Sequence, residues 1–364
     1  MLSNNKSIEI DGKAERRIYI DFLKVIAIYM VLFNHTETNG FMLFTIARTS
    51  KLYWFYLFNS ISIKMAVPLF FMASGALLLP KEESYKELIR KRVLRFVVVL
   101  VVASVIMYLY SCFRLNEQQF SVGIFVKTLY SSQTTISLWF LYSYLAFLIT
   151  LPILRKLTKA MTRIDYKWII AVYGTISCLS IFEYLVWKGS AVLNENISFF
   201  FMSIIVFYPM IGYYIDRVLE KTDFTVKRLI LMIFASVVAI IVCCFMTNYK
   251  CSLTGDWSEA SCQTFFDTLI FLPSITVFYG AKLLFLRYKP SNKLQKVIRL
   301  ASGTILGIFL IERICRQETK PIFLFLKPYL HSLPACWIWI LCACIIGGCV
   351  VLIIKRLPYI GDYI

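Results

Sequence analysis

The chain has 364 residues, of which 59% are hydrophobic and 16% aromatic, and its mean hydropathy is +0.71. A soluble domain of this length cannot bury so much apolar surface, so we predict an all-α polytopic membrane protein. The formal charge of +18 would suit a nucleic-acid-binding protein. In so apolar a chain, however, it is typical of basic loops beside a membrane, and we expect no nucleic-acid partner.

Ten apolar segments are long enough, at about twenty residues each, to form helices that cross a bilayer. They lie at about 18–38, 57–79, 93–113, 137–154, 168–187, 197–215, 229–247, 264–286, 300–315 and 335–354. Residues 18–356 are therefore predicted to form one ten-helix membrane domain between tails at 1–17 and 357–364. The first tail is polar and lacks a signal-peptide pattern, so we expect it to be retained.

The distribution of basic residues predicts the orientation of these helices. With the N-terminal tail inside, 26 of the 39 lysines and arginines fall in inner segments and 10 fall in outer segments. Because inner segments of membrane proteins carry the excess of positive charge, both termini are predicted to be cytosolic. The same asymmetry accounts for the net charge without nucleic acid.

Two connecting segments have patterns of their own. "PKEESYKELIRKRVLRF" (80–96) begins with proline and predicts a basic amphipathic helix on the inner surface that leads into the third membrane helix. "KPIFLFLKPYLHSLP" (320–334) has an apolar run too short to cross the bilayer and three prolines, which favours an interfacial or re-entrant segment. His331 in this segment is expected at the level of the lipid headgroups.

The eleven cysteines show no spacing typical of a zinc site, and we predict no metal site. Most of them lie within apolar runs, where cysteine packs as a small hydrophobic residue. Cys251 and Cys262 instead flank a short polar loop. A disulfide in an oxidising exterior and two free thiols are both open for this pair.

The first expected helix carries polar residues in an otherwise apolar run. Asp21 and Lys24 lie one turn apart near its start, and His35, one of two histidines in the chain, lies near its end. At about 100° per residue, Lys24 and His35 share one face and are about 16 Å apart along the axis. Because a lysine in hydrocarbon costs at least a few kcal/mol, this face is predicted to line the bundle interior or a wet cavity. The alternatives are a structural Asp21–Lys24 ion pair and a packing histidine.

A series of motifs resembles those of the acyltransferase-3 family, which are integral membrane O-acyltransferases. Its first helix typically has an acidic residue, a basic residue and a histidine at the spacing of Asp21, Lys24 and His35. Later matches are "VPLFFMASGALLL" (67–79), "RVLR" (92–95), "LWFLYSYLAFLITLPIL" (138–154) and "FYPMIGYYI" (207–215). Each motif alone is weak, but the ordered set, from 18 to 315, is fairly specific, and it agrees with the ten expected helices.

The resemblance implies an acyltransferase in the cell membrane, as a multi-pass protein of a bacterial plasma membrane. It implies transfer of an acyl group, acetyl first, from cytosolic acetyl-CoA to a hydroxyl of a cell-surface glycan or a lipid-linked acceptor. No bound cofactor is expected beyond this donor substrate. The acceptor, the acyl chain length and the oligomeric state stay open.

The resemblance also assigns roles to residues. His35 is the expected general base, because imidazole titrates near neutral pH. Arg92 and Arg95 are expected to bind the phosphates of CoA, although ordinary basic residues flanking a membrane helix have the same pattern. Lys24 is expected to bind the donor deeper in the membrane, with Asp21 holding Lys24 in place.

Four further residues are supporting candidates with structural alternatives. Trp139 and Tyr142 would line the acyl or acceptor tunnel or anchor the helix at the interface. Ser74 would line the site or, with its neighbour Gly75, only allow close helix packing. Glu312 stands where many members of the family have a second histidine, so a role that needs that histidine is not carried over to this chain. Glu312 is predicted to pair with Arg316 or to orient the cavity.

A function without acyl transfer is the alternative. Related membrane modules are associated with transport or sensing, but the expected helices here lack the paired glycine- or proline-broken segments of inverted-repeat transporters. A scaffold in a polysaccharide-assembly complex is a third option. Cleavage of the acetyl-CoA thioester by membranes that contain the protein would distinguish an acyltransferase from a transporter and from a scaffold.

Overall fold

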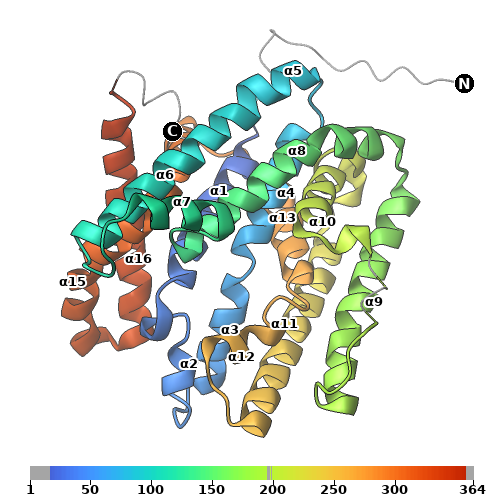
Figure 1. The fold of residues 1–364 in the computed structure, drawn as a ribbon. Coiled ribbons are helices and arrows are strands. Elements are labelled where there is room, and N and C mark those ends of the chain that lie inside the picture. Colours follow the sequence, from blue (N-terminus) through green and yellow to red (C-terminus); the bar gives the residue numbers. More distant parts are fainter. Residues whose placement is uncertain (1–16, 195–196, 198, 358–364) are drawn as a thin grey trace, which may run out of the picture.

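The computed structural model describes residues 17–194, 197 and 199–357, and across these residues the protein is all-helical, with 80% helix and no strand. In chain order the helices are α1 (Ile18–Asn34), α2 (Leu43–Ile46), α3 (Tyr53–Ile63), α4 (Ala66–Leu78), α5 (Tyr85–Leu88), α6 (Leu94–Phe113), α7 (Val122–Ser131), α8 (Trp139–Ala160), α9 (Arg163–Trp187), α10 (Ile204–Tyr213), α11 (Val226–Thr254), α12 (Glu259–Cys262), α13 (Phe271–Arg287), α14 (Asn292–Leu310), α15 (Glu312–Leu330) and α16 (Ser332–Ile354). The predicted tails at 1–17 and 357–364 lie almost wholly outside this description. Figure 1 shows α15 and α16 side by side at one edge of the bundle and α9 at the opposite edge.

Six helical segments of the described chain are long and apolar enough to cross a membrane. They are Tyr53–Leu78, Tyr85–Phe113, Ile136–Ala160, Arg163–Trp187, Val226–Thr254 and Ser332–Ile354. The other four expected spans coincide with α1, α10, α13 and α14, which are helical but shorter or less apolar. The count of ten and the cytosolic termini therefore stay predictions.

The second expected span, 57–79, falls within one membrane-length helical segment, Tyr53–Leu78. A tightened turn at Lys64 and Met65, whose backbone dihedrals stay in the right-handed helical region, divides this segment into α3 and α4. We call this interruption of the regular α-helical hydrogen bonds the break between α3 and α4. Pro68 lies in the first turn of α4, where its missing N–H removes no helical hydrogen bond. The break places Lys64 at a helix end inside the bundle.

The ninth expected span, 300–315, is also divided. α14 ends at Leu310 and α15 begins at Glu312, because Ile311 has φ −112° and ψ 18°. The segment 320–334, expected as interfacial or re-entrant, lies mostly in α15, which continues through Pro321 and Pro328 to Leu330. α15 packs against α16, where the Trp339 indole donates a hydrogen bond to Thr319 Oγ1 at 3.0 Å.

Within the basic segment at 80–96, helix begins at Tyr85 and runs into the third span, while residues 80–84 form a non-helical connection. Ser84 and Glu87 form a capping box that satisfies backbone N–H groups at the start of α5. A π-helical turn at Ile89–Val93 then joins α5 to α6. Figure 1 shows the two as one long helix that crosses the bundle diagonally.

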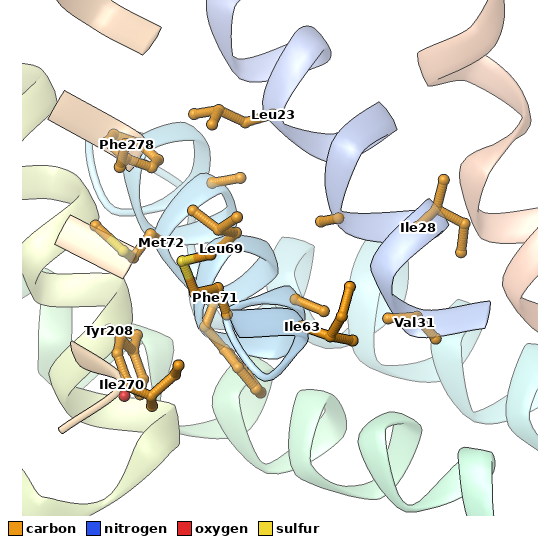
Figure 2. Packing of buried hydrophobic residues seen from close by; sticks show 14 of the residues in the cluster. Leu23, Ile28, Val31, Ile63, Leu69, Phe71, Met72, Tyr208, Ile270 and Phe278 are labelled. Atoms are coloured by element: carbon orange, nitrogen blue, oxygen red, sulfur yellow. The ribbon is translucent and has the colours of Figure 1, made fainter. Parts of the chain in front are cut away.

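The packed centre of the protein lies between α1, α4, α10 and α13. Figure 2 shows Leu23 and Ile28 of α1 on one side of α4 and Tyr208 and Phe278 on the other. α4 and α10 touch backbone to backbone, since a Cβ on Gly75 would lie 1.9 Å from the Pro209 carbonyl oxygen. A Cβ on Gly212 would likewise lie 2.0 Å from the Met72 carbonyl oxygen. The Ser-Gly pair of α4 therefore serves close helix packing through Gly75.

Candidate active site

A cavity of about 260 Å³ lies where the end of α1 meets the break between α3 and α4. We call it the histidine cavity. Its lining residues are Val31, Asn34, His35, Ile63, Lys64, Ala66, Val67, Pro68, Phe70, Ser137, Trp139, Phe140, Tyr173, Ile204, Tyr208, Asp267, Ile270 and Phe309. Its polar groups thus come from segments far apart in the chain.

His35 lies directly against Glu312. The imidazole Nδ1 is 3.5 Å from Glu312 Oε2, and the two side chains are 15% and 4% exposed. His35 is the residue that ends α1, and Glu312 is the first residue of α15, so each lies at a helix end. A carboxylate beside one ring nitrogen favours the tautomer that carries its proton there, which makes the other nitrogen, Nε2, the proton acceptor.

Glu312 also lies 3.7 Å from Nε of Arg316 one turn later, which agrees with the predicted i,i+4 pair. The contact with His35 was not predicted. It depends on the break at Ile311, which turns the start of α15 toward the end of α1. The sequence predicts that Glu312 pairs with Arg316 or orients the cavity, and no pattern within the sequence names His35 as its partner.

A second cavity, of about 380 Å³, is lined by all three predicted donor-binding residues, Lys24, Arg92 and Arg95. We call it the basic cavity. It is lined by Lys24, Phe70, Ser74, Leu77, Leu78, Lys91, Arg92, Arg95, Phe96, Val99, Phe140, Tyr144, Leu148, Ser302, Ile305, Leu306 and Phe309. Asp21 is buried one turn from Lys24, and Ser302 Oγ donates a hydrogen bond to its Oδ1 at 2.6 Å. The structure therefore brings Lys24, Ser74, Arg92 and Arg95 to one cavity.

Glu83 engages one of these arginines. Arg92 Nε donates to both carboxylate oxygens of Glu83, at 2.8 and 3.1 Å, and Arg155 Nη2 donates to Glu83 Oε2 at 2.9 Å. The hydrogen bond from Arg92, aided by Arg155, lowers the pKa of Glu83 to about 2. Glu83 was not predicted from the sequence. It lies in the loop between α4 and α5, and nothing in the local sequence indicates that its carboxylate binds two arginines.

The two aromatic candidates are placed differently. Trp139 lines the histidine cavity. Tyr142 is absent from the described lining of both cavities, and its hydroxyl donates to the Leu129 carbonyl oxygen at 2.9 Å, which ties α8 to α7.

The histidine cavity also contains two charged residues that sequence reasoning did not assign to a site. Lys64 Nζ donates to Gln263 Oε1 at 2.5 Å, and the exposed Asp267 faces the same cavity. A lysine within an apolar span is itself a signal of a functional site, as it was for Lys24. Nothing in the sequence around Asp267 predicts that it belongs to a functional site.

Cys251 and Cys262 lie next to each other as free thiols. Cys251 Sγ and Cys262 Sγ lie 3.3 Å apart as two buried thiols. Within the described residues, no cluster of three or more histidine, cysteine, aspartate or glutamate side chains is arranged to hold a metal ion.

Comparison with known proteins gives one match. The family described as "Acyltransferase domain" (Acyl_transf_3) matches residues 17–354, which is nearly the whole chain. Comparisons with curated proteins and with solved structures found no match.

Proposed function

Because the chain belongs to the acyltransferase-3 family and is a multi-pass membrane protein, we propose that it transfers an acetyl group from cytosolic acetyl-CoA to a hydroxyl of a cell-surface glycan or a lipid-linked acceptor. The membrane in question would be a bacterial plasma membrane. The observation that carries the proposal is the contact of buried Glu312 with His35, which lines a cavity that adjoins a second cavity lined by cations.

His35 is the general base of this reaction. Nε2 accepts the proton of the acceptor hydroxyl as its oxygen forms a C–O bond to the thioester carbonyl carbon. The tetrahedral intermediate collapses, the C–S bond breaks, and the electron pair leaves with sulfur. The imidazolium then returns its proton to the sulfur, so CoA departs as a thiol.

Glu312 positions the imidazole and stabilises its protonated form. A buried carboxylate 3.5 Å from Nδ1 holds the ring in one tautomer and offsets the positive charge that forms during the reaction. In this chain the glutamate takes the place of a second histidine, and the pair it forms with His35 needs no other imidazole.

The basic cavity fits the donor. CoA carries a pyrophosphate and a 3′-phosphate, and Lys24, Arg92 and Arg95 supply positive charge around one space. Arg92 donates hydrogen bonds to Glu83, so phosphate binding by Arg92 has to compete with this carboxylate. The excess of basic residues in the predicted inner segments supports a cytosolic position for this cavity, on the side where acetyl-CoA is made.

The histidine cavity fits a hydroxyl-rich acceptor. Asp267 and Lys64 supply hydrogen-bonding groups, and Trp139, Tyr173 and Tyr208 supply aromatic surfaces in the same space. A few polar groups among aromatic walls are typical of small-molecule sites and suit the polar edges and apolar faces of sugars.

The test measures acetyl transfer in membranes that contain the protein. Labelled acetyl-CoA is added, and both the release of CoA thiol and the label in glycan and lipid fractions are followed. We expect His35→Gln to abolish transfer, while His331→Gln, the same change at the other histidine, retains it. Full activity of a folded His35→Gln variant would overturn the role of His35, and intact thioester with the wild-type protein would overturn the function.

A transporter is the second candidate, because Lys64 lies inside a membrane-length helical segment and lines the histidine cavity, and ionisable residues within such segments often mark the path of a transported solute. The same membranes distinguish the two functions, since a transporter moves a solute without loss of the thioester.

A further inference from the structure

Three phenylalanines separate the two cavities. Phe70 of α4, Phe140 of α8 and Phe309 of α14 are the only described residues that line both spaces. The ring centroids of Phe70 and Phe140 are 5.9 Å apart, and those of Phe140 and Phe309 are 5.3 Å apart. Phe140 therefore contacts both of its partners and forms the middle of the wall.

This wall lies on the path that the proposed reaction needs. Lys24 and Arg95 are on one side of it, and His35 is on the other. A donor whose phosphates bind in the basic cavity has to pass its thioester between these rings to reach the imidazole. The pantetheine arm is slender and largely apolar apart from its amides, whereas the phosphates are bulky and charged, so only the arm suits an aromatic passage.

We propose that Phe140, with Phe70 and Phe309, is a gate that opens around the acyl-pantetheine arm and otherwise keeps water of the histidine cavity from the thioester. The inference rests on the proposed function. Rings that meet at their edges and at a tilt can rotate apart without moving their helices, and Phe140 is half-buried, which leaves room for this movement.

The gate explains how a cavity with a base and access to water avoids wasting the donor. If water replaced the acceptor, its oxygen would bond to the carbonyl carbon, the C–S bond would break, and acetate and CoA thiol would form. The proton lost from water would pass through the imidazole to the thiolate. A closed aromatic wall prevents this reaction until the arm itself fills the passage.

The first experiment measures this side reaction in membranes with labelled acetyl-CoA. The readout is the fraction of released acetyl that appears as free acetate. We expect Phe140→Ala to raise this fraction at least fivefold and Phe140→Leu to raise it less. Phe147→Ala is the matched control, because Phe147 lies on the same helix, is fully buried and lines neither described cavity.

A second experiment does not depend on acyl transfer. Ser74 lines the basic cavity, so Ser74→Cys is treated with a charged, membrane-impermeant thiol reagent from the outer face of intact cells, and the label at residue 74 is read by peptide mass spectrometry. We expect labelling when Phe140→Ala is also present and little labelling when Phe140 is intact. Equal labelling in the two backgrounds would overturn the gate.

The outcomes separate this inference from the function on which it rests. If the wild-type protein leaves acetyl-CoA intact, the proposed function fails and the gate fails with it. If the wild-type protein transfers acetyl and folded Phe140→Ala gives the wild-type fraction of acetate, the gate alone is overturned. A rise in acetate for Phe140→Ala but not for Phe147→Ala supports it.

Discussion

The two cavities are built from different parts of the helices. The histidine cavity takes His35 from the end of α1 and Lys64 from the break between α3 and α4, and Glu312 at the start of α15 lies behind it. The basic cavity takes Lys24 from within α1 and Arg95 from within the continuous helical segment Tyr85–Phe113. Helix ends let polar side chains from distant segments meet, whereas continuous helices place charges along a wall.

This difference matches the different tasks that we propose. Activation of a hydroxyl needs one oriented imidazole, so the histidine cavity depends on one pair of residues, His35 and Glu312, whose Nδ1 and Oε2 atoms lie 3.5 Å apart. Binding of phosphates needs positive charge and room, which several cations share. Substitutions in the histidine cavity should therefore cause large losses in kcat, and substitutions in the basic cavity should cause smaller losses in affinity.

The largest effect is expected at Glu312. Glu312→Gln keeps the shape of the side chain but removes the charge that orients His35, and we expect kcat to fall by about 10²- to 10⁴-fold. KM for acetyl-CoA should stay within about twofold, since Glu312 is not among the residues that line the basic cavity. Initial rates of CoA release in membranes, measured over a range of acetyl-CoA concentrations, give both constants.

Two further variants make this test specific. Glu312→Asp keeps a carboxylate and should recover part of the lost kcat. Glu318→Gln is the control, because Glu318 is exposed on the same helix and pairs with Tyr110 and Arg114 away from both cavities. An equal fall in kcat for Glu312→Gln and Glu318→Gln would mean that Glu312 does not act through His35.

The comparison also shows what the sequence could predict. Helical periodicity placed Lys24 and His35 on one face, and they line two adjoining cavities in the structure. Charge and motif patterns likewise brought Ser74, Arg92 and Arg95 to the basic cavity. The placement of these residues beside the cavities agrees with the sequence patterns, because each pattern depends on spacing within one helix, which is local; their donor-binding and catalytic roles stay predictions.

The contacts that were missed are not local. Glu312 meets His35 only because the chain breaks at Ile311, and neither proline nor glycine marks that residue. Glu83 bonds to Arg92 and Arg155 from a loop whose path depends on how α4, α6 and α8 pack. Pairings between distant segments are set by tertiary packing, which one sequence does not reveal.

The next largest effect concerns the packing that both cavities share. Gly75→Ala would place a Cβ 1.9 Å from the Pro209 carbonyl oxygen and force α4 away from α10. Since the obstacle is backbone, we expect a destabilisation of about 3 kcal/mol, at the upper end for overpacking. Thermal unfolding of the purified protein in detergent measures it. Gly303→Ala, where a Cβ meets nothing within 4 Å, is the control and should be neutral or stabilising.

A smaller effect is expected in the basic cavity. Arg95→Gln removes one charge-assisted contact to the donor, worth about 1.5 to 3 kcal/mol, and KM for acetyl-CoA should rise roughly tenfold or more with kcat little changed. The control is Arg90→Gln. Arg90 is an exposed arginine of the same helical segment and lies outside both described cavities. An unchanged KM for Arg95→Gln would remove Arg95 from the donor site and leave it as a residue that flanks the membrane.

The smallest effect is expected for Glu83→Gln, which tests whether Arg92 binds the donor or only holds the helices together. The pKa of Glu83 is lowered from 4.5 to about 2 in the folded protein, so its ionised form stabilises the fold at higher pH. This contribution is complete above about pH 4.5 and is lost as the pH falls toward about 2. Glu83→Gln should lower the melting temperature at neutral pH and flatten its dependence on pH across that interval.

Glu82→Gln is the matched control for this measurement. Glu82 is exposed and pairs only with the exposed Lys159 among described partners, at 2.6 Å, and such surface pairs contribute little to stability. If Glu83 only anchors Arg92 and Arg155, Glu83→Gln changes stability and leaves KM for acetyl-CoA unchanged. If Arg92 also binds phosphate, Glu83→Gln releases its guanidinium and lowers that KM. The direction of the change in KM therefore decides whether Arg92 belongs to the donor site or to the scaffold that holds α4, α6 and α8 together.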